Sequence, residues 1–143
     1  METPTNYISN NGNNNDNSIN VCWEDKVILI ADDIRINYLV IKAALNKTKA
    51  QLLWVEDGEK AIEKCKTNKN IDLVLMDYHM PKVNGLEAIR EIKKFRKDLP
   101  VILQTTYAVD EEEQNYITSN CDDFILKPIS PKSLISKLNK YFD

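Results

Sequence analysis

Glycine is scarce in this chain of 143 residues: only Gly12, Gly58 and Gly85 are present. The sequence therefore has no GxGxxG motif and no Walker-type loop, the two glycine-rich devices that surround nucleotide phosphates. We do not expect an enzyme built on a glycine-rich phosphate loop.

Cysteine is also infrequent, and the three residues Cys22, Cys65 and Cys121 lie far apart. The odd number and the lack of CxxC spacing argue against a disulfide framework and against a zinc site. A reducing, cytoplasmic compartment is the simplest setting for such a chain.

Two further features are missing. No apolar run reaches membrane-spanning length, and the N-terminal METPTNYISNN has neither the basic flank nor the apolar core of a secretory signal. The net charge of −3 supplies no general basic face for nucleic acid. We expect no membrane contact by this segment and no direct nucleic-acid binding.

The chain length favours one folded domain. Residues 1–24 are rich in asparagine and carry too little apolar surface to offset the entropy of ordering. We interpret 1–24 as a flexible tail or linker, with Cys22 and Trp23 against the start of the domain, and 25–143 as the domain.

Apolar segments alternate with amphipathic ones throughout 25–143. Strands are predicted at 26–31, 51–55, 71–76, 101–106 and 124–126, and helices at 34–46, 59–67, 86–95, 110–119 and 131–142. This alternation predicts an α/β fold with right-handed crossovers and a five-stranded parallel sheet. The first and third strands are the most apolar and therefore central, which favours the doubly wound, flavodoxin-like order 2-1-3-4-5 with five helices.

The sequence predicts which residues face inward in two of the helices. In helix 34–46 the spacing predicts that Asp33 caps the helix and that the inward face consists of Ile36, Leu39, Val40, Ala43 and Ala44. Helix 110–119 has a thin apolar face, mainly Tyr116 and Ile117, so it should be the loosest.

Polar residues follow four of the strands: Asp32, Asp33, Asp77, Thr105 and Lys127. In a parallel doubly wound sheet these strand ends meet at one edge, where ligands bind. Three carboxylates repel one another unless a cation is present, and an oxygen-only set suits Mg²⁺. A lysine and a hydroxyl beside them suit a phosphoryl group, which a carboxylate can accept as an aspartyl phosphate.

Each residue also has a simpler interpretation: Asp33 as a helix cap, Thr105 as an ordinary strand residue, Lys127 as a solvated charge. Asp77 is harder to explain away, because an ionised carboxylate after a buried strand is costly without partners. The five groups together favour a site.

This ordered set resembles the receiver domain of two-component response regulators. The matching motifs are Asp32–Asp33, Asp77 with Met80, Pro81 and Gly85, then Thr105, and Lys127–Pro128, within 26–142. The resemblance implies that Asp77 accepts a phosphoryl group from a histidine kinase or a histidine phosphotransfer protein. It further implies a Mg²⁺ site formed by Asp32, Asp33, Asp77 and the backbone carbonyl of His79.

The resemblance implies that Thr105 and Lys127 contact the phosphoryl oxygens and that Lys127–Pro128 is a cis peptide. Phe124 matches the aromatic switch position, so phosphorylation would alter the face formed by helix 110–119, strand 124–126 and helix 131–142. A homodimer through this face is a further implied partner. The domain would be a signalling switch that at most catalyses its own phosphorylation and dephosphorylation.

Asn37, four residues after Asp33, together with the run ILIADD resembles receivers of hybrid histidine kinases. The leader is then a linker from a kinase core, or the tail of a standalone regulator. The chain ends one helix after the last strand, so we expect no DNA-binding output domain there. His79, Thr106 and Tyr107 flank the implied phosphoryl position, and their bulk predicts slow loss of the phosphate.

Three other functions are open. A phosphatase with Asp77 as nucleophile would need an acid two residues later, where His79 stands. A degenerate binding module is disfavoured by the intact acidic pair and Lys127. A flavin-binding module is disfavoured because Asp32 and Asp33 would repel the flavin phosphate.

Overall fold

The computed structural model describes residues 7–8, 19–105 and 110–142. Its main sheet has five parallel strands in the order β4-β3-β5-β6-β7. These strands are β3 (Val27–Ala31), β4 (Gln51–Val55), β5 (Leu73–Asp77), β6 (Val101–Thr105) and β7 (Asp123–Leu126). Counted along the chain, the order is 2-1-3-4-5, so the predicted α/β topology is confirmed.

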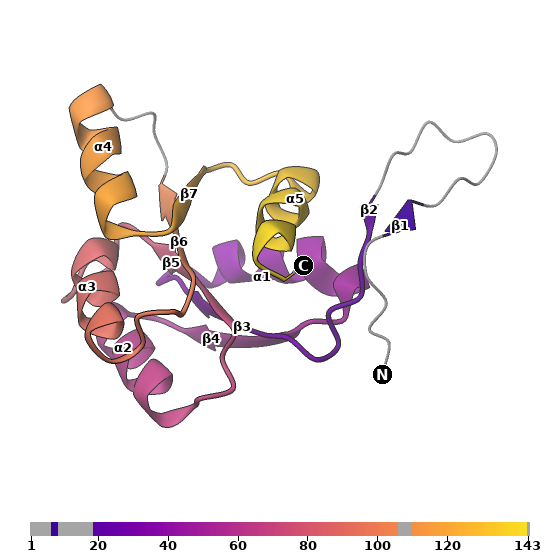
Figure 1. Ribbon diagram of the computed structural model, residues 1–143, viewed down its shortest axis with the longest axis horizontal. Helices are drawn as coiled ribbons and strands as arrows, with labels where there is room; N and C mark the ends of the chain where they lie inside the picture. Colours follow the sequence, from indigo (N-terminus) through magenta and orange to yellow (C-terminus); the bar gives the residue numbers. More distant parts are fainter. Residues whose placement is uncertain (1–6, 9–18, 106–109, 143) are drawn as a thin grey trace.

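The described ranges contain five helices, of which the first four connect the strands and the last follows β7: α1 (Arg35–Leu45), α2 (Gly58–Thr67), α3 (Gly85–Phe95), α4 (Glu111–Asn120) and α5 (Pro131–Phe142). A 3-10 turn η1 (Asn46–Thr48) follows α1. Helices α2, α3 and α4 cover one face of the sheet, and α1 and α5 cover the other (Figure 1). The direction of winding reverses between β3 and β5, which is where a doubly wound sheet forms its crevice.

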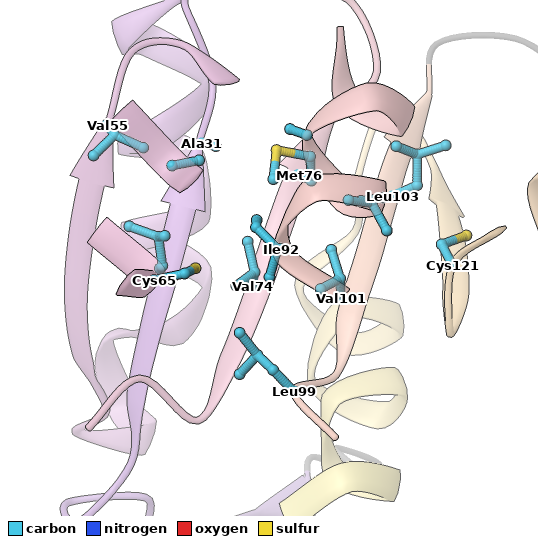
Figure 2. Packing of buried hydrophobic residues seen from close by; sticks show 14 of the residues in the cluster. Ala31, Val55, Cys65, Val74, Met76, Ile92, Leu99, Val101, Leu103 and Cys121 are labelled. Atoms are coloured by element: carbon cyan, nitrogen blue, oxygen red, sulfur yellow. The ribbon is translucent and has the colours of Figure 1, made fainter. Parts of the chain in front are cut away.

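Side chains along each strand alternate between the two faces. Figure 2 shows Val74, Met76, Val101 and Leu103 on the face that α3 covers, with Ile92 among them. The residues between them belong to the opposite core under α1 and α5, which includes Ile28, Ile30, Leu73, Leu75, Ile102 and Ile125. This alternation decides which face each residue at a strand end takes.

The predicted inward face of α1 is wrong for four of its five residues. Ile36 is 62% exposed and Val40 is 50% exposed, whereas Ile41 and Leu45 are buried against α5. The segment carries apolar residues around much of its circumference, so periodicity alone did not select the face. Leu39 and Ala43 are also exposed, whereas Ala44 is half-buried and packs against this core, so the expectation is confirmed for Ala44 alone.

In α4 the expectation for Ile117 is confirmed, because this residue is fully buried. Tyr116, also predicted to face inward, is 47% exposed and hydrogen-bonds through its hydroxyl with Arg90 of α3.

The packed part of the chain begins before residue 25, the predicted domain boundary. Val21 and Trp23 are buried, and the Trp23 ring packs edge-on against Phe142 at 4.9 Å. Upstream, β1 (Tyr7–Ile8) pairs antiparallel with β2 (Ile19–Asn20). The rest of the predicted tail lies outside the described residues.

Among the helices of the described ranges, none has the length and apolarity needed to cross a membrane.

Candidate functional site

Asp77 is the last residue of β5 rather than the residue after it, because the strand spans 73–77 instead of the predicted 71–76. Its side chain is nearly covered, with 4% of the residue exposed. Asp72, which precedes the strand, contacts β3: its carboxylate accepts a hydrogen bond from the Val27 backbone N–H at 2.8 Å.

Asp32, Asp33 and Asp77 meet at the carboxyl edge of the sheet, as their positions predict. Each offers a carboxylate oxygen, and these oxygens lie within 4.8 Å of one another. Asp32 and Asp77 are buried, while Asp33 is exposed. The crevice therefore has two covered acids and one that reaches solvent.

Lys127 bridges the two covered acids. Its Nζ lies 3.2 Å from Asp32 Oδ2 and 3.2 Å from Asp77 Oδ1. The Lys127 backbone N–H donates to Thr105 at 2.7 Å, and the peptide bond to Pro128 is cis, as the resemblance implied. Two acids share one cation, so the crevice retains an excess of negative charge.

Burial raises the pKa of Asp77 above its ordinary value. The nearby Lys127 ammonium opposes this rise, the Asp32 carboxylate adds to it, and hydrogen bonds from Lys127 and the His79 backbone oppose it. The ionised form of Asp77 is thus costly in this environment, and additional positive charge would stabilise it.

Asp33 does not cap α1; this prediction is wrong. The cap position is Ile34, and its backbone N–H donates to Asp32 Oδ1 at 2.9 Å. Asn37 Nδ2 donates to the same oxygen at 3.3 Å. Because Asp32 takes these local bonds, the Asp33 carboxylate is left out of the helix cap.

Two residues beside Asp32 were missed as parts of the site. Asn37 was noted only as a marker of subtype. Trp54 Nε1 donates to the Asp32 backbone carbonyl at 2.9 Å, and the Trp54 ring stacks on Tyr38 at 5.1 Å. The only sequence signal for this contact is Trp54 itself. It is the next-to-last residue of β4, the strand that pairs with β3 just before Asp32.

Two glycines fix the loop between β5 and α3. A Cβ atom on Gly85 would lie 2.4 Å from the Asp77 carbonyl oxygen, and one on Gly58 would lie 2.6 Å from the Val83 carbonyl oxygen. Both contacts are with backbone, so neither tolerates a side chain without movement. In the same loop Lys82 adopts φ 69°, the left-handed region. Asn84 caps α3 by accepting from Glu87 N at 3.0 Å.

The remaining predicted residues lie around this edge. Thr105 ends β6, and in the described part of the chain no hydrogen bond joins it to Asp77. His79 is exposed, and its ring lies 4.8 Å from that of Tyr78. Phe124 is half-buried beneath Lys137, whose Nζ lies 5.7 Å from its ring. The predicted flanking residues Thr106 and Tyr107 lie outside the described residues.

The donor set fits a hard cation. All three acidic residues supply oxygen, the chemistry that Mg²⁺ requires, and the exposed Asp33 leaves room for the water ligands that Mg²⁺ keeps. A divalent ion would also balance the excess negative charge that Lys127 leaves.

A doubly wound sheet with an acidic, lysine-bridged crevice at its reversal point is the architecture of a receiver-type domain. Residues 28–139 match the family model described as the response regulator receiver domain. The chain belongs to the response regulator receiver domain family, and it is a receiver domain of two-component signalling.

Known proteins show the same relationship. The chain is 34% identical over 112 residues to the autoinducer 2 sensor kinase/phosphatase LuxQ of Vibrio vulnificus, covering 78% of this chain and 13% of that protein. It is 32% identical over 118 residues to the aerobic respiration control sensor protein ArcB of Escherichia coli, covering 81% and 15%. The chain thus spans less than a sixth of these relatives.

A solved structure also resembles the whole domain: the receiver domain of the sensor histidine kinase PA1611 of Pseudomonas aeruginosa. It superimposes with a TM-score of 0.74 at 27% identity, covering 81% of this chain and 96% of that chain. That structure contains a magnesium ion coordinated in its active site cleft.

Proposed function

We propose that this receiver accepts a phosphoryl group on Asp77 from a phosphohistidine of a histidine kinase or a histidine phosphotransfer protein. The observation that carries the proposal is the crevice itself: three carboxylates within 4.8 Å and one lysine bridging two of them. This arrangement brings a nucleophile, a cation site and a phosphoryl-binding charge together.

In the transfer, an Asp77 carboxylate oxygen attacks phosphorus as the bond from phosphorus to the donor imidazole nitrogen breaks. The electron pair of that bond stays on the nitrogen, and the product is an acyl phosphate. Lys127 stands 3.2 Å from Asp77, so its ammonium can move to an incoming phosphoryl oxygen. Thr105 ends the neighbouring strand and would contact a second oxygen.

Asp32, Asp33, Asp77 and the backbone carbonyl of His79 would hold Mg²⁺. When bound, the ion would neutralise charge on the phosphoryl oxygens and lower the cost of bringing an anion to an acidic crevice. Asn37 and Trp54 would keep Asp32 oriented toward the ion through their 3.3 Å and 2.9 Å hydrogen bonds.

The output would run through Phe124 and the face formed by α4, β7 and α5. A phosphoryl group adds about two negative charges. Movement of Thr105 toward them would open space for the half-buried Phe124 ring, which shifts the population between two packings. Leu126 is exposed on this face, which would also form a homodimer.

The donor protein would dock on α1, which borders the crevice. Ile34, Ile36, Leu39 and Val40 are large apolar residues that are exposed there. Apolar residues grouped on the surface beside a reactive carboxylate suit a protein that brings its histidine to Asp77. Changing Ile36 and Val40 to serine should slow transfer from a phosphorylated histidine phosphotransfer domain and leave phosphorylation by acetyl phosphate unchanged. The matched control is Leu126→Ser, which removes an exposed apolar side chain from β7 instead of from the α1 surface.

We further propose a cytoplasmic location, since Cys22, Cys65 and Cys121 are all free thiols. The segment before the packed residue Val21 would serve as a linker or tail. The similarity to LuxQ and ArcB favours a receiver within a larger kinase, with the kinase core joined through that linker.

The test of phosphorylation uses intact mass. The native protein is incubated with Mg²⁺ and acetyl phosphate, and it should gain one phosphoryl group. Asp77→Asn, or removal of Mg²⁺ with EDTA, should abolish the gain. No gain in the native protein would favour a degenerate binding module, and continuous release of inorganic phosphate over many turnovers would favour a phosphatase.

A further inference from the structure

Gln104 is a polar residue inside a fully buried strand. It has no exposed surface, and neither Oε1 nor Nε2 has a hydrogen-bond partner in the described part of the chain. Native proteins contain few such groups, because an unpaired buried amide is destabilising. The neighbours of Gln104 in the sheet indicate why an unpaired amide is buried at this position.

The register of the sheet places Gln104 beside Asp77. The two residues are Cα partners between β5 and β6, and Gln104 is in turn the partner of Ile125 in β7. Met76 and Leu103 point to the α3 face (Figure 2), so Asp77 and Gln104 share the opposite face. Neighbouring strands are about 4.8 Å apart, so the two side chains are adjacent.

The side chain of Lys127 crosses β6, the strand that carries Gln104. Lys127 follows β7, yet its Nζ reaches Asp77 of β5. Because β6 lies between β7 and β5, the lysine side chain has to cross β6 near its carboxyl end, where Gln104 is the next-to-last residue. The unpaired amide thus belongs to the register partner of Asp77, on the strand that the Lys127 side chain crosses.

We propose that Gln104 is a positioning residue whose amide is paired only when Asp77 carries a phosphoryl group. This inference rests on the proposed phosphorylation. When Lys127 turns from the carboxylates to a phosphoryl oxygen, Gln104 Oε1 accepts one of its remaining N–H groups. Gln104 Nε2 then donates to the carbonyl oxygen of the acyl phosphate. The amide is unpaired in one state and paired in the other, so it favours the phosphorylated state.

The variant Gln104→Met removes both polar atoms and keeps an unbranched side chain of similar length. We expect it to resist denaturant better than the native protein before phosphorylation, because an unpaired amide is gone. We also expect acetyl phosphate with Mg²⁺ to phosphorylate it about tenfold more slowly, the loss of one hydrogen bond to a charged group. Ile102→Met, buried on the same face and strand, is the matched control and should retain the native rate.

A rate for Gln104→Met equal to that of the native protein would overturn the inference, whatever its stability. If neither protein gains a phosphoryl group, the proposed function fails with it, so the two failures are distinguishable.

A second measurement needs no variant. In the native protein, the side-chain NH₂ signals of Gln104 should shift and become protected from exchange when Mg²⁺ and beryllofluoride, a phosphoryl mimic, are added. Unchanged signals, with shifts elsewhere in the crevice, would overturn the inference.

Discussion

Lys127 Nζ lies 3.2 Å from Asp77 Oδ1, and burial nevertheless raises the pKa of Asp77. The single lysine, shared with Asp32, does not offset the desolvation of the carboxylate. Without additional positive charge, the ionised carboxylates in the crevice lower the stability of the folded protein. Local destabilisation of this kind is typical of functional sites.

Asp77→Asn should therefore be more stable than the native protein at neutral pH without Mg²⁺. Below pH 3.8, the ordinary pKa, both folded and unfolded Asp77 are protonated and the difference vanishes. As the pH rises toward the raised folded value, the native protein binds more protons folded than unfolded, so its stability falls while that of the variant does not. Urea unfolding at a series of pH values measures this.

The exposed residue Asp98 supplies the control for that series, because Asp98→Asn should show no such gain. A native protein that is more stable than Asp77→Asn at neutral pH in EDTA would contradict the electrostatic account.

Trp54→Phe should weaken Mg²⁺ binding. Phenylalanine keeps the stacking on Tyr38 but loses the 2.9 Å hydrogen bond to the Asp32 carbonyl. A bond of about 1 kcal/mol corresponds to roughly a fivefold change in affinity. Calorimetric titration measures it, with Trp23→Phe as the control far from the crevice. Equal affinities for Trp54→Phe and the native protein would remove Trp54 from the site.

Gly85→Ala and Lys82→Gly should have opposite effects on stability, although they lie in one loop. The alanine Cβ would press on the Asp77 backbone and cost about 1–3 kcal/mol. Glycine at Lys82 relieves the left-handed backbone at φ 69° and should gain up to about 1 kcal/mol. Chemical denaturation distinguishes them, and two changes of the same sign would argue against this loop geometry.

The thiols should differ in reactivity. Burial raises the pKa of Cys65 and of Cys121 to about 11 each, so at pH 8 both remain protonated as well as covered. Cys22 is partly exposed. Iodoacetamide should label only Cys22 in the folded protein and all three residues in denaturant, as mass spectrometry counts them. Rapid labelling of a second thiol in the folded state would contradict the packing.

The order of the strands and the meeting of the three acids could be predicted from local sequence patterns. In a parallel sheet the carboxyl ends of all strands lie at one edge, so residues that follow the strands come together there. Buried apolar runs marked the strands, and the abrupt change to Asp32 or Asp77 marked the edge. The inward face of α1 could not be predicted in this way. Its sequence is apolar on several sides, and packing against α5 selected Ile41 and Leu45.

The contacts that support the site were less accessible to sequence reasoning. Trp54 reaches Asp32 from β4, 22 residues along the chain, and Asn37 lies only five residues away but bonds to Asp32 rather than to the helix end. Asp33 seemed suited to cap α1, but the Asp32 carboxylate took the Ile34 N–H instead. Gln104 did carry a signal, a polar residue inside the buried strand VILQT, whose meaning depends on the register with Asp77.

Asp77 is the residue that would carry the phosphoryl group. Borohydride reduces an acyl phosphate to an alcohol, so an aspartyl phosphate becomes homoserine. The native protein should be treated with acetyl phosphate and Mg²⁺, reduced, digested and sequenced by mass spectrometry. Homoserine at position 77 alone is the predicted result. Homoserine at Asp32 or Asp33, or at no position in a protein that gained phosphoryl mass, would contradict the assignment.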